Sequence, residues 1–555
     1  MNIPKPLLTA AIVFALSLSV SCAFAGQNTP APVEGTHGMV SSAHPLATRA
    51  GLAILQKGGN AFDAAVAVAA VLNVVEPAMS GMGGYGTILV YSKAYNALRF
   101  LNCSGRIPAG LKPDIFRAPT PDFEKNRIGA AAVSTPGNAN AWEAMSKKYG
   151  KLRWRELFDP AIELAETGYV LTAREANTIK DAFVGFPGTA KAIFGKEGAP
   201  LAAGDRLIQK DLAASLRAVA QEGAGEFFRG AIGKAVVAEV RARGGYLSLD
   251  DLADNEAEWW DPIGIDYRGY KVFTASPPAT AFCSLVRLGI MSRFDVAALG
   301  SNTPEFLHIF AEATKLGFWV RLKYAGDPAH AAPPLDRLLS EAYWKEQTAA
   351  IDPGRAKPFV YPGLEPAPDS HTTHFVVADS DGNIVSATQT LGNAFGSRIM
   401  APGTGIWLNN SLAYSTFEPK GNPMDAIPGR RKLSGDCPTI ILKDGLPWAA
   451  LGTPGGHNIG QTVPQMVMNL TDFKMDIRAA LAAPMIAFIE PDTIGVERTI
   501  PETVRKALEA KGHKIRLMGG LTNSSGLTIV LGEYGKPSRF LGAADPRGQG
   551  LALGY

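Results

Sequence analysis

The sequence predicts an α+β protein, and three observations support this fold class. Apolar residues recur at helical spacing near the N-terminus, residues 140–350 are mostly helical in pattern, and runs rich in Thr, Val and Ile follow from Thr372 onward. The chain of 555 residues is too long for one ordinary hydrophobic core. We therefore expect two closely joined halves or two domains.

Two helices are predicted before residue 76. The first runs from Ala47 to Lys57 and is stopped by Gly58-Gly59. Asn60 is then placed to cap a second helix that continues to about Val75. Because residues 64–75 are apolar nearly all round, we expect the second helix to be buried.

The glycine-rich stretch after these helices formally matches a dinucleotide-binding motif. Gly81-Met82-Gly83-Gly84-Tyr85-Gly86 has the G-x-G-x-x-G spacing. That motif requires a strand before it and a helix after it. Here a helix comes first and a predicted strand at Thr87–Tyr91 follows, so we interpret the glycines as a turn and expect no nucleotide cofactor.

A β-hairpin is predicted directly after a proline-rich linker. Residues 353–370 contain five prolines, and two β-forming runs, Thr372–Ala378 and Ile384–Thr390, then flank Asp381-Gly382. One hydroxyl residue begins the first run and another ends the second. Further elements are expected as strands at Trp448–Gly452, Leu527–Leu531 and Arg539–Gly542, and as helices at Gln461–Leu470 and Glu502–Lys511.

The first 25 residues have the pattern of a secretory signal peptide. Lys5 supplies a positive charge, Leu7 to Val20 is apolar, and Ala23-Phe24-Ala25 is an A-x-A cleavage site. The apolar run is too short for a convincing membrane span. We expect cleavage after Ala25 and export to a periplasm or the medium. Cys22 leaves a lipoprotein alternative open, in a poor sequence context for lipid attachment.

Charge and cysteine content exclude several classes of function. The formal charge of +3 is small and scattered, which argues against nucleic-acid binding. Beyond the leader only Cys103, Cys283 and Cys437 occur, without C-x-x-C spacing, so we expect buried free thiols and neither a disulfide framework nor a zinc site. His371 and His374 are three apart on a predicted strand and point to opposite faces, so no metal site is expected there.

The motifs along the chain resemble those of the γ-glutamyltranspeptidase family, in family order and over nearly the whole chain after the leader. The segments that carry the resemblance are Gly58–Ala65, Glu76–Gly84, Thr372–Phe375 with the hairpin after it, Phe395-Gly396 through Gly405–Asn410, Leu433–Thr439, Thr453–Gly456, and Asp545–Arg547 with the ending Gly554-Tyr555.

The resemblance implies a four-layer αββα sandwich of the N-terminal-nucleophile (Ntn) hydrolase class. It also implies that the chain cuts itself between His371 and Thr372, giving a large subunit (26–371) and a small subunit (372–555) that form a heterodimer. The freed α-amine of Thr372, with an unperturbed pKa of about 7.7–8.0, would then act as base for its own hydroxyl.

The family also implies roles for three further catalytic residues. Thr390 corresponds to a second threonine that orients the nucleophile. Gly455 and Gly456 correspond to the pair whose backbone amides form the oxyanion hole, where glycine lets the substrate approach the main chain closely.

The positions that would recognise the glutamyl group depart from the family pattern. Ser104 stands where a carboxylate-binding arginine is expected, and Arg106 lies two residues further on. Tyr414 stands where an amine-binding aspartate is expected. An expected asparagine falls on Gly392, next to Asn393, and the expected serine pair is Ser434 followed by Gly435. The candidate substrate-binding residues are Arg106, Asn393, Tyr414, Ser434 and Gly435.

We therefore expect an amide hydrolase acting through an acyl-Thr372 intermediate, with or without transfer to an amine. The first choice of substrate is a γ-glutamyl compound such as glutathione. One alternative is a cephalosporin-acylase-like enzyme for a non-glutamyl acyl amide. Another is an exported binding protein that has lost catalysis. A small amide or peptide is the expected ligand, without cofactor, metal, nucleic acid or membrane span.

Overall fold

Two seven-stranded antiparallel sheets form the centre of the chain from Pro32 to Tyr555, which is one compact unit. The computed structural model describes residues 31–361, 371–432 and 434–555. The predicted leader, its cleavage site after Ala25 and Cys22 lie outside the described residues.

Sheet B holds the predicted hairpin at its centre, in the order β21-β2-β12-β13-β3-β4-β9. Its strands are β21 (Leu551–Gly554), β2 (Gly38–Ser42), β12 (His371–Asp379), β13 (Ile384–Gly392), β3 (Tyr85–Ser92), β4 (Ala97–Asn102) and β9 (Glu258–Trp260).

Sheet A has the order β1-β20-β19-β15-β14-β11-β10. Its strands are β1 (Val33–Gly35), β20 (Pro537–Ala544), β19 (Ser525–Leu531), β15 (Leu446–Gly452), β14 (Thr439–Lys443), β11 (Tyr270–Thr274) and β10 (Ile263–Tyr267).

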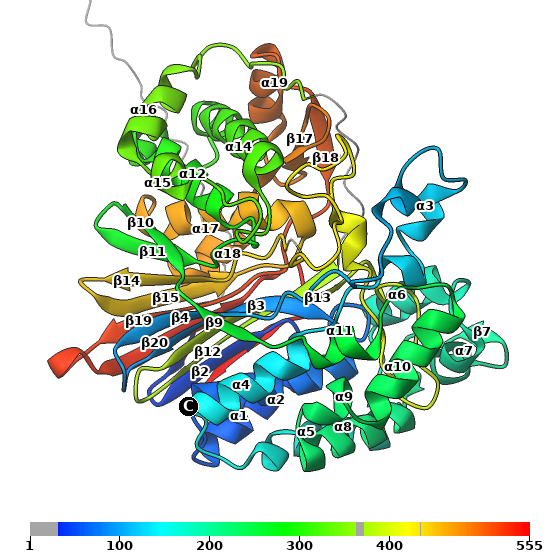
Figure 1. The fold of residues 1–555 in the computed structure, drawn as a ribbon. Coiled ribbons are helices and arrows are strands. Elements are labelled where there is room, and N and C mark those ends of the chain that lie inside the picture. The colour runs from blue at the N-terminus through cyan, green and yellow to red at the C-terminus, as the bar shows by residue number, and fades with distance from the viewer. Residues whose placement is uncertain (1–30, 362–370, 433) are drawn as a thin grey trace, which may run out of the picture. The chain divides into compact units, whose positions relative to one another are not determined.

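The two sheets stack face to face between two layers of helices (Figure 1), which is the expected αββα order. Strands β12 and β13 contact β15 and β19 across the stack. The helices against sheet B are α1 (Pro45–Gln56), α2 (Ala61–Val75) and α4 (Asn138–Tyr149), with α5 (Asp159–Thr167) packed on α2 and α8 (Lys210–Glu222) packed on α5. Those against sheet A are α12 (Phe282–Met291), α17 (Ile459–Thr471) and α18 (Ile477–Ala482), with α14 (Pro304–Tyr324) packed on α12.

Other helices and a small third sheet surround the two large sheets and their helices. They are α3 (Phe123–Asn126), α6 (Ala173–Phe183), α7 (Gly188–Phe194), α9 (Gly225–Phe228), α10 (Ala231–Ala242), α11 (Leu249–Ala253), α13 (Val296–Leu299), α15 (Leu335–Leu338), α16 (Glu341–Ala349), α19 (Glu502–Ala510), and a small sheet of β16 (Ile486–Ile489), β17 (Thr493–Glu497) and β18 (Ile515–Met518).

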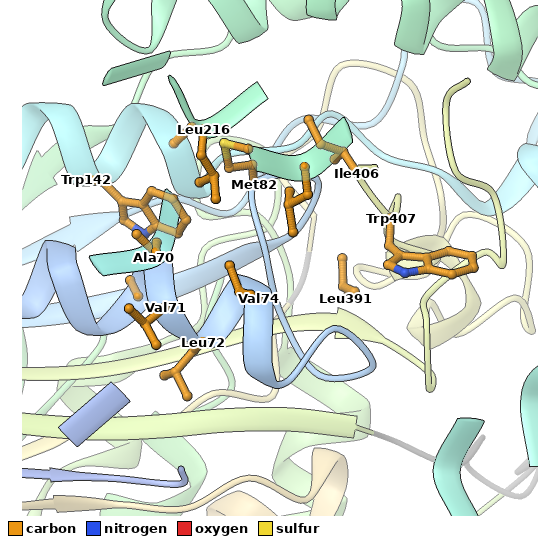
Figure 2. Packing of buried hydrophobic residues seen from close by; sticks show 14 of the residues in the cluster. Ala70, Val71, Leu72, Val74, Met82, Trp142, Leu216, Leu391, Ile406 and Trp407 are labelled. Carbon is orange, nitrogen blue, oxygen red and sulfur yellow. The ribbon is translucent and has the colours of Figure 1, made fainter. Parts of the chain in front are cut away.

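Helix α2 is the buried support of sheet B, as the sequence predicts. Asn60 and Asp63 form a reciprocal capping box at its start, and all of its residues are buried. Its residues Val71 and Leu72 belong to the same apolar cluster as Trp142 and the loop residue Trp407 (Figure 2). An all-round apolar helix is stable here because protein covers every face of it.

The hairpin contributes to the cores on both sides of sheet B. Phe375 and Val377 pack in the cluster on the side of α2, whereas Val376 and Ala378 pack in the cluster that includes sheet A. This alternation follows from the two-residue period of a strand. Both faces of β12 are therefore covered by protein, and Thr372, Thr373 and His374 at its start are buried.

Three of the sequence predictions can be compared directly with the structure. The glycine-rich stretch lies between α2 and β3, so helix precedes strand, as predicted. Cys103, Cys283 and Cys437 are buried and free. Strands β10 and β11 lie within the region predicted to be mostly helical; they are short, and β11 is stabilised by pairing with β14, far along the chain.

The predicted cut between residues 371 and 372 does not separate two domains. Strands β2, β3 and β4 of sheet B precede this bond, and β12, β13 and β21 follow it. Sheet A likewise combines β10 and β11 with β14 and β15. Two chains produced by such a cut would share both sheets.

Asp379, at the end of β12, ties the hairpin to α2. Its carboxylate accepts hydrogen bonds from the amides of Ala61 (2.8 Å), Asp381 (3.0 Å) and Asn383 (3.0 Å). We expect Asp379→Ala to lower the free energy of unfolding by about 2–3 kcal/mol, because buried donors lose a charged acceptor. Urea denaturation followed by fluorescence measures the change.

Asp381 in the same turn is the control. Its side chain is 58% exposed and pairs with Lys151, so Asp381→Ala should change the stability by less than about 1 kcal/mol. Equal effects of the two substitutions would contradict a specific role of Asp379.

Candidate active site

The hairpin presents a polar row toward sheet A at the start of β12 and the end of β13. Thr372 and His374 lie on the same side of β12 as Val376. Thr373 lies on the opposite side, where its hydroxyl donates to Glu76 at 2.7 Å. The strand period therefore separates two adjacent threonines into two environments.

A β-bulge brings the two predicted catalytic threonines together. Thr372 pairs with Thr390, whereas His371 pairs with Gly392, so one extra residue, Leu391, lies on β13. Gly392 has a positive φ of 99°, a conformation that glycine adopts without strain.

Three hydrogen bonds define the geometry at the bulge. The Thr372 hydroxyl donates to Thr390 Oγ1 at 3.3 Å, and the Thr390 hydroxyl donates to the His371 carbonyl at 2.6 Å. The Gly392 amide donates to Thr390 Oγ1 at 2.8 Å. The Thr390 hydroxyl thus bridges the predicted nucleophile and the carbonyl of the bond predicted to break.

Both threonines line a small pocket. The described residues around it are Tyr85, Thr280, Arg321, Thr372, Thr390, Tyr414, Gly435, Asp436, Gly456 and His457. Its free volume of ≈ 20 Å³ admits water but no larger substrate in the continuous chain. Seven stretches of the chain, counting the hairpin as one, meet here.

The predicted glycine pair lies on a turn at one wall of this pocket. Gly455 and Gly456 have positive φ values of 133° and 55° and lead through a short 3-10 turn into α17. Amides at the start of a helix have no acceptor within the helix and lie at its positive end. Such a turn can stabilise a negative oxygen beside Thr372.

Four predicted substrate-binding residues lie at or next to the pocket. Tyr414 and Gly435 line it. The Tyr414 hydroxyl donates to Asn393 Oδ1 at 2.9 Å, so Asn393 helps to position the Tyr414 side chain. Ser434 is buried, and its carbonyl accepts from the Thr280 amide at 2.8 Å.

The structure does not bring Arg106 to this pocket. Its guanidinium lies 3.3 Å from Glu258 Oε1 and donates to the Gly429 carbonyl at 3.4 Å. Ser104 is buried, with its hydroxyl on Asn102 Oδ1 at 2.6 Å. The segment in which a carboxylate-binding arginine was expected thus supplies no cation to the pocket.

Comparison with known proteins agrees with the motifs and the fold. A family model described as Gamma-glutamyltranspeptidase matches residues 47–555. The chain belongs to this family. It is 35% identical to the glutathione hydrolase proenzyme of Escherichia coli (strain K12), over 99% of this chain and 100% of that protein.

Acylases of the family are equally similar. The chain is 36% identical to the Acylase ACY 1 proenzyme of Pseudomonas sp. (strain SE83), over 88% of this chain and 90% of that protein. The crystal structure of cephalosporin acylase from Bacillus halodurans superposes with a TM-score of 0.86 at 32% identity, covering 96% of this chain and 99% of that one. The family therefore comprises hydrolases and acyltransferases with different named substrates.

The sequence analysis missed three charged or titratable residues that line the pocket, namely Arg321, Asp436 and His457. Arg321 lies in the last turn of α14, where nothing in the local pattern indicates a pocket. Asp436 was quoted within the motif of Ser434 but given no role. An acidic residue in that otherwise uncharged motif was the one signal available.

Burial strongly shifts the pKa values of two oppositely charged neighbours at this site. Burial raises the pKa of Asp436 to about 7, against the opposing effects of the Ser434 hydroxyl and of Lys432. Burial and the nearby Arg321 lower the pKa of Lys432 to about 7, while Asp436 opposes that shift. Each of the two groups therefore favours the charged form of the other, against the effect of burial.

Arg321 is held by a relay through His457. Its Nη2 lies 2.7 Å from His457 Nε2, and His457 Nδ1 lies 3.2 Å from Glu490 Oε1. An arginine nitrogen can only donate, so Nε2 is the acceptor and Nδ1 carries the proton. Burial, followed by the charge of Arg321, lowers the pKa of His457, which agrees with a neutral ring.

One cluster outside the pocket groups three residues that could bind a metal, among those that the structure describes. His308, Glu312 and His513 have ligand atoms within 4.8 Å of one another. Their donors and acceptors are already used: His308 Nδ1 lies 2.8 Å from His513 Nε2, and Lys315 Nζ lies 2.6 Å from Glu312 Oε1. The lysine ammonium already supplies the positive charge at Glu312, so we interpret this cluster as a structural network.

Among the described helices, none is both long enough and apolar enough to span a bilayer.

His374 makes the stability of the protein depend on pH. Burial lowers its pKa from 6.5 to about 3, and its Nδ1 lies 2.8 Å from Thr388 Oγ1. The unfolded chain takes up a proton near pH 6.5 and the folded chain does not, so stability falls as the pH decreases from 6.5 toward 3. We expect His374→Gln to reduce this slope by up to about 1.4 kcal/mol per pH unit.

Urea midpoints measured between pH 7 and pH 5 test this prediction. The exposed His330 provides the control, since His330→Gln should leave the slope unchanged. An unchanged slope in His374→Gln would show that the buried ring does not take part in the pH dependence.

Proposed function

We propose that this chain is a self-cleaving amide hydrolase and acyltransferase that acts on γ-glutamyl compounds such as glutathione through an acyl-Thr372 intermediate. The hydrogen-bond chain from Thr372 through Thr390 to the His371 carbonyl carries the proposal. Membership of a family that includes a named glutathione hydrolase supports the choice of substrate.

The proposed maturation step uses the same atoms. The Thr372 hydroxyl oxygen attacks the His371 carbonyl carbon, the carbon–nitrogen bond breaks, and the hydroxyl proton passes to the released amine. Water then hydrolyses the resulting ester and leaves a carboxylate on His371. The donor on the His371 oxygen, Thr390, stabilises the negative charge that develops there.

Turnover follows the same chemistry with an external amide. The α-amine of Thr372 takes the proton of its own hydroxyl, and the oxygen attacks the substrate carbonyl. The amides of Gly455 and Gly456 stabilise the tetrahedral oxyanion, helped by the positive end of α17. Loss of the amine product leaves an ester on Thr372, which water or an acceptor amine resolves.

Two further aspects of the proposal concern the mature protein. Residues 26–371 and 372–555 would stay together as a heterodimer, and the shared sheets support this because each chain alone would expose strand edges. We also propose export with removal of residues 1–25, which rests on the sequence pattern of the leader.

An acylase for a non-glutamyl group is the second candidate function. The similarity to Acylase ACY 1 and to the cephalosporin acylase structure favours it, as does the absence of Arg106 from the pocket. The third possibility, a binding protein without catalysis, is disfavoured because the Thr372–Thr390 geometry and the glycine turn are intact.

Substitution of Thr372 tests the nucleophile. Thr372→Ala removes the attacking oxygen, so we expect no cleavage and no amide hydrolysis. Thr372→Ser keeps both the hydroxyl and the amine and should retain both at a lower rate. A denaturing gel distinguishes one band from two, and γ-glutamyl-p-nitroanilide reports hydrolysis. Two fragments or turnover in Thr372→Ala would refute the role of this residue.

Substitution of Thr390 tests the donor to the His371 carbonyl. Thr390→Val keeps the shape but removes the hydroxyl, and we expect self-cleavage to slow on the order of a hundredfold. The appearance of fragments after translation in vitro gives the rate.

Thr388→Val is the matched control for Thr390→Val. Thr388 lies two residues away in the same row but contacts His374, so its loss should leave the cleavage rate within about threefold, far less than loss of an oxyanion donor. Equal slowing in both variants would contradict a specific donor role for Thr390.

A further inference from the structure

The pocket beside Thr372 combines one carboxylate with one guanidinium. Among its described lining residues, Asp436 is the only acidic side chain and Arg321 the only permanently charged cation. They come from different elements: Arg321 from α14, and Asp436 from the segment before β14. Neither corresponds to a residue that the family motifs led us to expect.

Asp436 has an oxygen available for a ligand. The residue is 2% exposed, and its Oδ2 has no hydrogen-bond partner among the described residues. The charge of Lys432 and a hydrogen bond with Ser434 stabilise the ionised carboxyl, but both are outweighed by burial. A buried acceptor without a donor is costly, and an incoming ammonium would satisfy it.

Arg321 is likewise incompletely bonded. It is 7% exposed, its Nε is buried without a partner, and the one hydrogen bond of its side chain within the described chain goes to His457. The relay through His457 to Glu490 fixes the guanidinium beside the pocket. A carboxylate could accept from the remaining N–H groups.

We propose that Asp436 and Arg321 bind the ammonium and the carboxylate at the α-amino-acid end of the acyl group. This inference rests on the proposed function, since it concerns the acyl group that is transferred to Thr372. The family pattern expects charged residues at positions 104 and 414, where this chain has Ser104 and Tyr414. In our proposal, Asp436 and Arg321 bind the two charged groups of the ligand in their place.

Charge balance favours a zwitterionic ligand over an anionic one. Around the pocket, the two cations Arg321 and Lys432 lie near two acidic groups, Glu490 and Asp436. A γ-glutamyl group adds one positive and one negative charge. A glutaryl group has the same chain without the ammonium and would bury an unbalanced negative charge.

Three anilides that differ by one group at a time test the inference. These are γ-glutamyl-, glutaryl- and butyryl-p-nitroanilide, which carry respectively both charges, the carboxylate alone, and neither. For the wild type we expect kcat/KM to be highest for the γ-glutamyl compound.

Asp436→Asn should lower kcat/KM for the γ-glutamyl compound on the order of ten- to a hundredfold, because a charge-assisted contact is lost. The glutaryl and butyryl compounds should change by less than about threefold, well under the effect of one such contact. Arg321→Gln should lower both carboxylate-bearing compounds and spare the butyryl one. Arg321→Lys should recover part of that loss, since it keeps the charge.

Asp472→Asn is the matched control. Asp472 is a buried carboxylate on Tyr267 and Arg268, remote from the described pocket lining, and its loss should not change the ranking of the three compounds. If Asp436→Asn lowers all three compounds equally or none of them, the inference is wrong. It is equally wrong if the wild type prefers the glutaryl compound.

If the proposed amide hydrolase function itself is wrong, the experiment gives a different result. In that case the wild type stays a single band or hydrolyses none of the three anilides. Two bands on the gel for each variant show that it has folded well enough to cut itself. A change in substrate ranking then reports on recognition and not on folding.

Discussion

The hydrogen bond from the Thr390 hydroxyl to the His371 carbonyl is the contact on which the site depends. A regular antiparallel pair would place His371 and Thr372 opposite consecutive residues of β13. The bulge at Leu391 shifts this register by one residue, so that Thr390 reaches both the Thr372 hydroxyl and the carbonyl before it. One backbone irregularity therefore aligns the proposed nucleophile, its hydrogen-bond donor and the bond that we propose is cleaved.

That irregularity lies at the start of a strand that is packed on both faces. Strand β12 is paired on both sides, and its side chains enter an apolar cluster above and another below. Helix α2 is buried on all sides and is tied to the end of the hairpin by Asp379. A displacement of about 1 Å at a catalytic centre is expensive in rate, and the layers packed against both faces of sheet B oppose it.

Local sequence signals predicted the elements that carry most of the machinery. Asn60 and the apolar run after it define α2, and the Thr372 and Thr390 runs define the hairpin. Both depend on residues close in sequence, where periodicity and turn chemistry act. Thr372, Thr390 and Gly456 came together as the motifs implied, although local patterns alone assign them no chemistry.

Contacts between distant segments explain what the sequence did not predict. Strand β11 forms because β14 offers a partner, and the intervening residues carry no sign of that pairing. In the sequence, Arg321 is one of several cations in a helical segment, and nothing there indicates a pocket. In the fold, it lines the same pocket as Asp436. Arg106 was a candidate through its distance along the chain alone, and the structure joins it to Glu258 instead.

The charges of the pocket show why reaction type and substrate choice can diverge within one fold. The proposed nucleophile and its donor belong to the hairpin, and the glycine turn leads into α17; the two sheets position both elements. Arg321 and Asp436 come from α14 and a connecting segment, and the hydrogen bonds that join Thr372, Thr390 and the His371 carbonyl do not involve them. An opposite pair in a closed pocket favours a ligand that also carries both charges, because each buried ion then gains a partner. Recognition can therefore move from one set of residues to another while the chemistry stays with the hairpin.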